Sequence, residues 1–262
     1  MEPYYYAHIS PAAARPHQFE GKQFVRQMRE TVEEFLQGLP PATTKASVGF
    51  QWIWISNPNV PPHQFNPDGT PRDEWSERVS NVSILRMNGE EMLNELKRKA
   101  SVARQNLPQE SVEMISVERD RTIMDIKNLA IATKTTTGKV GSPIPMPHTP
   151  TWMLFSSVDR VDHIWSIVAH AVATNQLGPG ATVSPKLKHP ETGSRLICIY
   201  TYDFSDTEDI IRGLHKLREL GLVAPNEWPP RYYNCDAYTY LEIHPGNQWG
   251  IPLSLYSSEE ML

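Results

Sequence analysis

The stretch from Thr151 to Tyr256 limits the possible folds most, because strand-type and helix-type patterns follow one another through it. TWMLF, which begins at Thr151, is a short apolar run of strand length. RLICIYTYDF, residues 195–204, is β-branched and aromatic and alternates with period two. Both runs predict strands that are buried in a sheet.

Helical periodicity follows each of these strands. VDHIWSIVAHAV, residues 161–172, places its apolar residues on one helical face, with Trp165 among them. Residues 205–220 repeat this spacing and end at Gly221, a usual helix terminator. AYTYLEI, residues 237–243, predicts a third strand. No glycine-rich phosphate loop follows the first strand, so an α+β sheet is favoured over a doubly wound nucleotide-binding fold.

The N-terminal half predicts fewer elements. Apolar spacing indicates a helix over residues 24–36, and VGFQWIWIS, residues 48–56, has strand composition. Two more helices are expected over residues 88–106 and from residue 111 to about 134.

The domain organisation follows from where the prolines cluster. The chain has 23 prolines, and they fall between the periodic segments, as expected of loops. We predict one domain over residues 21–262, with proline-rich insertions near 57–80 and 137–150. Residues 1–20 are expected to form an N-terminal arm that is either disordered or docked by its tyrosines.

Composition narrows the class of function. The 262-residue chain has a formal net charge of -5, so a nucleic-acid role requires a local basic patch. Its two cysteines supply neither a disulfide framework nor zinc-ligand spacing, which favours a cytoplasmic location, or also a nuclear one. No apolar run has the length of a membrane span or a signal peptide, so no membrane partner is expected.

Several ordered segments carry a family resemblance: TWMLF, VDHIW, VSPK, RLICIYTYDFSD, DAYTYLEI and NQWGIPLSLY. Together they resemble the basophilic leukaemia expressed protein family, an uncharacterised eukaryotic family, over about residues 125 to 256, with weaker similarity at VGFQWIWI. This family is similar in fold to translation initiation factor 4E. The resemblance therefore implies an α+β fold with a curved antiparallel sheet and helices on its convex face.

The resemblance also implies a ligand site. In cap binders of this fold two tryptophans sandwich a methylated guanine, a glutamate reads its edge, and basic side chains hold the phosphates. Lys186 falls at a phosphate-contacting position, with Lys188 and Arg195 as neighbours, and Tyr200 falls where a cap-binder strand ends in tryptophan. GKVGSPIPMPHTP, just before Trp152, lacks the Trp-Glu pair of those proteins, so authentic cap recognition is not expected.

Each of these residues could also have a purely structural role. Trp152 and Trp165 lie on apolar faces and are expected in the core. Trp52, in a strand, and Trp249, in a glycine-containing turn, join Tyr200 as candidate stacking residues. The basic residues around KHPETG form either a phosphate contact or a solvated turn.

Catalytic signals are weak. The sequence has no Gly-x-Ser-x-Gly elbow, no Walker loop and no His-x-x-x-His pair. Cys235 and His244 are a conceivable nucleophile and base, but two such residues near one strand are commonplace. We expect no enzyme, no metal site and no cofactor.

Two functions from different classes follow. The first is a non-catalytic domain that binds RNA or a nucleotide-like ligand on the concave sheet face, with phosphate contacts from Lys186, Lys188 and Arg195. The alternative is a protein-interaction adaptor that uses the convex helices, Val161 to Leu177 and Asp209 to Leu220. The first requires exposed aromatic side chains beside lysines on the sheet, and the second requires an exposed apolar strip on the helices.

Overall fold

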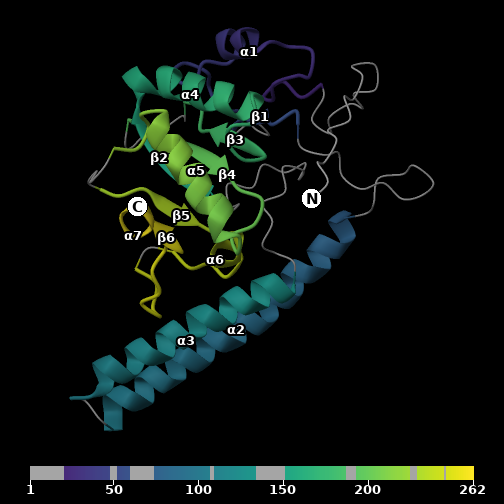
Figure 1. The fold of residues 1–262 in the computed structure, drawn as a ribbon. Coiled ribbons are helices and arrows are strands. Elements are labelled where there is room, and N and C mark those ends of the chain that lie inside the picture. The colour runs from purple at the N-terminus through teal and green to yellow at the C-terminus, as the bar shows by residue number, and fades with distance from the viewer. Residues whose placement is uncertain are drawn as a thin grey trace, which may run out of the picture.

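The described part of the chain folds around one open antiparallel sheet (Figure 1). The computed structural model describes residues 21–47, 52–59, 74–106, 109–133, 151–186, 193–224, 229–244 and 246–262, without the side chains of 74–80. The six strands lie in the order β1-β3-β4-β2-β5-β6. They are β1 Ile53–Ser56, β2 Thr151–Ser157, β3 Gly180–Val183, β4 Ser194–Tyr200, β5 Tyr232–Asn234 and β6 Tyr256–Ser257.

Seven helices accompany the sheet within these ranges, which confirms the predicted α+β class. They are α1 Val32–Gly38, α2 Glu74–Asn106, α3 Ser111–Ala132, α4 Val158–Ala173, α5 Thr207–Glu219, α6 Asp236–Tyr240 and α7 Ser258–Met261. No helix of the described residues is both long enough and apolar enough to cross a membrane.

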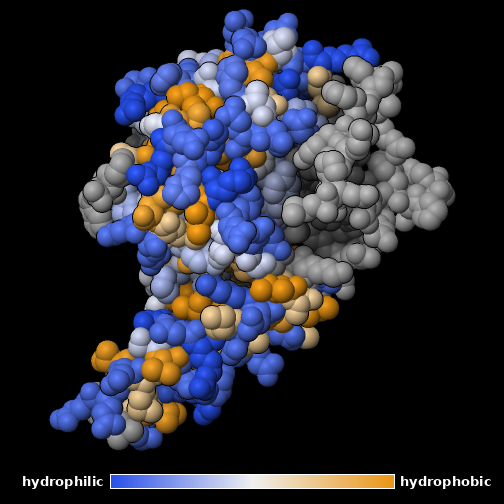
Figure 2. Space-filling view, in the orientation of Figure 1, coloured by the Kyte–Doolittle hydropathy of each residue, from blue (hydrophilic) through white to orange (hydrophobic). Residues whose placement is uncertain are grey.

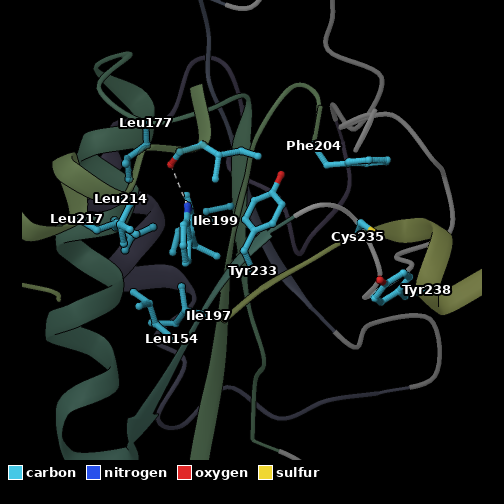
Figure 3. Packing of buried hydrophobic residues seen from close by; sticks show 14 of the residues in the cluster. Leu154, Leu177, Ile197, Ile199, Phe204, Leu214, Leu217, Tyr233, Cys235 and Tyr238 are labelled. Carbon is cyan, nitrogen blue, oxygen red and sulfur yellow. Dashed lines mark hydrogen bonds between the residues drawn. The ribbon is translucent and has the colours of Figure 1, made fainter. Parts of the chain in front are cut away.

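Helices α4 and α5 cover one face of the sheet and enclose the main core (Figure 1). Leu154 and Ile197 project from the sheet toward Leu214 on α5 (Figure 3). Trp152 and Trp165 are completely buried, as predicted, and the Trp152 Nε1–H donates to the Ile210 carbonyl at 3.2 Å. The helix-covered face is therefore an ordinary apolar core, and the indole N–H of Trp152 has a hydrogen-bond partner within it.

The other face of the sheet, here called the second face, bears the alternate residues of each strand. Paired residues of neighbouring antiparallel strands point the same way, and one row crosses five strands. It runs Trp54, Thr182, Cys198, Met153 and Tyr232. The alternation predicted for residues 197–200 is thus confirmed, with Cys198 and Tyr200 on the second face.

Helices α2 and α3 form a long hairpin that projects from the body of the molecule (Figure 1). Small buried side chains, including Ala100, Ala103 and Thr122, allow the two helices to lie close together. Gly89 of α2 faces Leu241 just after α6, where a Cβ would meet the leucine side chain at 2.5 Å. This contact holds the hairpin against the body.

The first helix is shorter than expected. It begins at Val32, because Thr31 caps it and Glu34 completes a capping box. The preceding residues instead extend the sheet beside β1: Trp54 N–H donates to the Phe24 carbonyl at 2.9 Å, and Arg26 N–H donates to the Trp54 carbonyl at 3.1 Å. Apolar spacing alone did not reveal this change of conformation.

Two further predictions were wrong in position. AYTYLEI is not a strand, because residues 236–240 form α6 and the strand is β5, just upstream. This run is buried on several sides, so period two does not separate strand from helix. Helix α2 begins at Glu74, inside the segment expected as a loop. The proposed arm, residues 1–20, and the insertion 137–150 lie outside the described residues.

An ion pair joins α1 to α4. The Nδ1–H of His170 donates to the Ser166 carbonyl at 2.8 Å, and its Nε2 lies 2.9 Å from Glu33 Oε1. The hydrogen bond to Glu33, then that to Ser166, raises the pKa of His170 above its ordinary 6.5, and the same pair lowers the pKa of Glu33. Protonated His170 therefore favours the folded state.

We expect this pair to make stability depend on pH. Because the His170 pKa is raised by folding, its contribution is complete below the unfolded pKa and is lost as the pH rises through the folded pKa. Urea unfolding should show that the wild type loses stability between about pH 6 and about pH 8.5. In His170→Gln this loss should be smaller. His163→Gln is the control, because His163 is an exposed histidine on the same helix. If His163→Gln reduces the pH dependence as much as His170→Gln does, the pair of His170 with Glu33 is not its cause.

Candidate functional site

The second face carries exposed aromatic side chains near its centre. Phe155 of β2 is 56% exposed and Tyr232 of β5 is 40% exposed. Met153 lies between them on β2, opposite Tyr232 and half-buried, and Leu196 lies opposite Phe155. A sheet surface of this kind offers flat apolar contact to a ring-bearing ligand.

The β1 side of the same face is a closed aromatic cluster. Trp54 and Tyr200 stack with ring centroids 5.6 Å apart and an interplanar angle of 17°. The hydroxyl groups of Tyr200 and Thr182 form a hydrogen bond of 2.9 Å. Trp52 is half-buried beside them. Trp54 and Tyr200 are therefore buried against each other and leave little ring surface for a ligand.

Two exposed lysines lie where β3 leaves the sheet. Lys45 and Lys186 pair in a parallel bridge, in which Lys186 N–H donates to the Thr44 carbonyl at 2.7 Å and Ala46 N–H donates to the Lys186 carbonyl at 3.0 Å. Ser184, two residues before Lys186, is hydrogen-bonded to Leu196 and so lies in the row of Phe155. Two strand spacings and two residues put Lys186 roughly 12 Å from Phe155 along the sheet.

The predicted phosphate contacts separate in the structure. Lys186 is exposed at the end of the sheet, whereas Arg195 is 3% exposed on the helix-covered face. The Arg195 Nε–H donates to the Pro41 carbonyl at 3.5 Å and an Nη1–H donates to the Ser194 carbonyl at 3.3 Å. This placement removes Arg195 from a site on the second face. Lys188 lies outside the described residues.

The predicted stacking residues also separate. Trp52 and Tyr200 share the second face, but Tyr200 is 1% exposed, so its ring is already occupied by Trp54. Trp249 is half-buried and lines a cavity against the α2/α3 hairpin, away from the aromatic cluster. Trp52 is therefore the one predicted stacking residue that retains a partly open position on the sheet.

Two residues of the surface were missed by the sequence reasoning. Phe155 follows from the pattern of TWMLF, because an inward Trp152 sends residues 151, 153 and 155 to the opposite face. Tyr232 gave no comparable signal, because its strand was placed several residues too late. Strand alternation could therefore have predicted the exposure of Phe155 but not that of Tyr232.

Neither cysteine of the chain is exposed or acidic enough to act as a thiolate. Burial raises the pKa of Cys198 and of Cys235 to about 12, so both thiols stay protonated near neutral pH. Cys235 is 2% exposed, which does not suit a nucleophile that must reach a substrate. Within the described ranges, His, Cys, Asp and Glu side chains form no group of three able to hold a metal ion.

The helices differ in the apolar surface that they expose. On α4 and α5, Val158 is the large apolar residue with appreciable exposure. The hairpin exposes many more, and Figure 2 shows apolar side chains spread along it. On α3 these are Val112, Met114, Val117, Met124 and Ile131. The apolar strip that an adaptor requires is therefore on the hairpin and not on the convex helices.

A family model described as basophilic leukemia-expressed protein Bles03 matches residues 5–242. The chain belongs to this family. The match covers most of the chain, including the strands of the second face up to β5 and the whole α2/α3 hairpin. Membership in the Bles03 family thus agrees with the resemblance seen in the sequence and extends it toward the N-terminus. The description of the family specifies no ligand or reaction, so any role for the surface must be argued from its geometry.

Proposed function

We propose that the chain binds single-stranded RNA, or a nucleotide-like ligand, on the second face of its sheet. The observation that carries the proposal is the pair of exposed aromatic residues, Phe155 and Tyr232, on the face of the sheet opposite the core formed with α4 and α5. Bases of any sequence can stack on such side chains, because every base has a π face. The role is binding, without a catalytic step.

Electrostatics support the same surface. The net charge of -5 makes the chain as a whole repel a polyanion, so attraction must come from local charges. Lys45 and Lys186 are exposed neighbours, and no carboxylate pairs with either lysine among the described residues. Of the phosphate contacts predicted from the sequence, Lys186 is kept and buried Arg195 is dropped. Lys45 is added beside Lys186. A strand of RNA would lie with bases over Phe155 and its backbone toward these lysines.

The likeness to initiation factor 4E is part of this proposal. An open antiparallel sheet with helices on one face agrees with that fold, and fold alone does not carry function. The tryptophan pair of cap recognition has no counterpart among Trp152 and Trp165, which are core residues. The ligand is therefore expected to be bound without selectivity for a methylated cap.

Alanine substitution of the exposed aromatics tests the proposal. Fluorescence anisotropy with a labelled oligouridine should show Phe155→Ala and Tyr232→Ala weakening binding by about 1–3 kcal/mol each, roughly 5- to 150-fold in Kd. Both side chains are substantially exposed, so the thermal midpoint should change little.

Tyr202→Ala is the matched control. Tyr202 is 42% exposed just after β4, and its pKa is raised by burial and then by Asp209 of α5, which places it beside that helix. It should leave oligouridine affinity unchanged. Equal affinity of wild type and both test variants, or an equal loss in Tyr202→Ala, would contradict a stacking role for the second face.

A second candidate function is supported by the hairpin. Val117, Met124 and Ile131 of α3 repeat every seven residues and are 55%, 56% and 46% exposed. Seven residues are about two helical turns, so these side chains form a narrow apolar seam along one side of α3. The occupant that fits is α3 of a second copy, running antiparallel, because the three residues are evenly spaced about Met124 and would then face the same three residues of the other chain. The adaptor hypothesis thus moves from α4 and α5 to α3.

Sedimentation equilibrium tests self-association through this seam. The wild type is expected to dimerise with concentration, and Val117→Glu with Met124→Glu is expected to be monomeric, because each change places a charge in the seam. Val112→Glu is the control, since Val112 is 79% exposed on a different side of α3. A wild type that stays monomeric throughout, or a control that dissociates equally, excludes the second-copy interface.

A further inference from the structure

A cavity of about 260 Å³ lies between the α2/α3 hairpin and the loop at residues 247–250. Apolar side chains from both helices contribute to its wall: Leu96, Ala100 and Ile115. Lys97, Arg104 and Arg119 line it together with Trp249. Its location is separate from the second face of the sheet.

The charges in this cavity are unbalanced. Three cationic side chains line it, and no carboxylate does. Lys97 and Arg104 form no ion pair with any described residue. The Arg119 Nη2–H donates to Ser116 Oγ at 2.9 Å, and its Nε, which has no hydrogen-bond partner among the described residues, forms only a long ion pair of 3.9 Å with exposed Asp120.

Neighbouring cations on the hairpin provide a contrast. Lys99 Nζ lies 2.7 Å from Glu118 Oε2, and Arg98 donates to both carboxylate oxygens of Glu95. Those pairs are what surface helices ordinarily form. The hairpin thus has carboxylates near its other cations, and the cavity has none in its lining. The cavity is therefore suited to an anion from outside the chain.

The loop at residues 247–250 supplies a rigid wall. The Trp249 indole N–H is buried and has no hydrogen-bond partner among the described residues. Asn247 braces the loop, since its Nδ2 donates to the Ile251 carbonyl at 2.8 Å and its Oδ1 accepts from the Trp249 and Ile251 N–H groups. Gly250, at φ 67°, brings the backbone so close that a Cβ there would lie 3.6 Å from Arg119 Nη1.

We propose that this cavity binds a small phosphorylated compound through its phosphate group. Guanidinium groups match phosphate oxygens with paired donors, and Arg119 and Arg104 supply two of them beside Lys97. The volume lies just below the usual range for drug-sized ligands, so the occupant is a compound with one or two phosphate groups and not a folded macromolecule.

Isothermal titration calorimetry with pyrophosphate on the full chain, at constant ionic strength, tests this site. We expect saturable binding at one site, weakened at least about tenfold by Arg119→Gln, because a hydrogen bond to a charged group is lost. Arg104→Gln removes the other guanidinium of the cavity and should also weaken binding. Arg98→Gln, on the same hairpin but paired with Glu95, should leave the affinity unchanged.

The outcomes separate this site from the sheet surface. Absence of saturable heat in the wild type, or equal affinities for Arg119→Gln and Arg98→Gln, overturns the proposal. Phe155→Ala should bind pyrophosphate normally, whatever its effect on RNA. A loss of oligouridine affinity in Arg119→Gln as large as the loss of pyrophosphate affinity would show the cavity to be an RNA backbone contact and would refute a small-ligand site.

Discussion

The antiparallel pairing of β2 with β4 is the constraint on which both faces of the molecule depend. It sets Trp152 opposite Ile199 and Phe155 opposite Leu196, so adjacent residues of one strand go to opposite sides. A slip of one residue would expose Trp152 and bury Phe155 against the helices. The long apolar core under α4 and α5 makes such a slip prohibitive, and the exposed surface is fixed as a consequence.

The same register explains why the predicted basic and aromatic residues do not form one site. Arg195 is in β4 on the side of Ile197, so it enters the helix-covered face and binds backbone carbonyls. Tyr200 is on the second face but closes against Trp54. The cations that form no ion pair within the described residues lie elsewhere: Lys186 at the sheet end, and Lys97 and Arg104 beside the loop of Trp249.

The sequence was informative wherever one periodicity dominated. Apolar spacing located α4 and the burial of Trp165, and it located α5 as well. It failed where local capping or burial on all sides overrode periodicity, as at Val32 and in α6. The cavity at Trp249 joins residues more than a hundred positions apart, and no local pattern reports such a meeting.

The central claim is that the second face of the sheet is where RNA contacts the protein. Ultraviolet crosslinking of the full chain to oligouridine, followed by peptide mass spectrometry, tests it most directly, because crosslinks form at residues in contact with bases. We predict crosslinked peptides that contain Phe155 in β2 and Tyr232 in β5. Crosslinks confined to α4, α5 or the α2/α3 hairpin would contradict the claim.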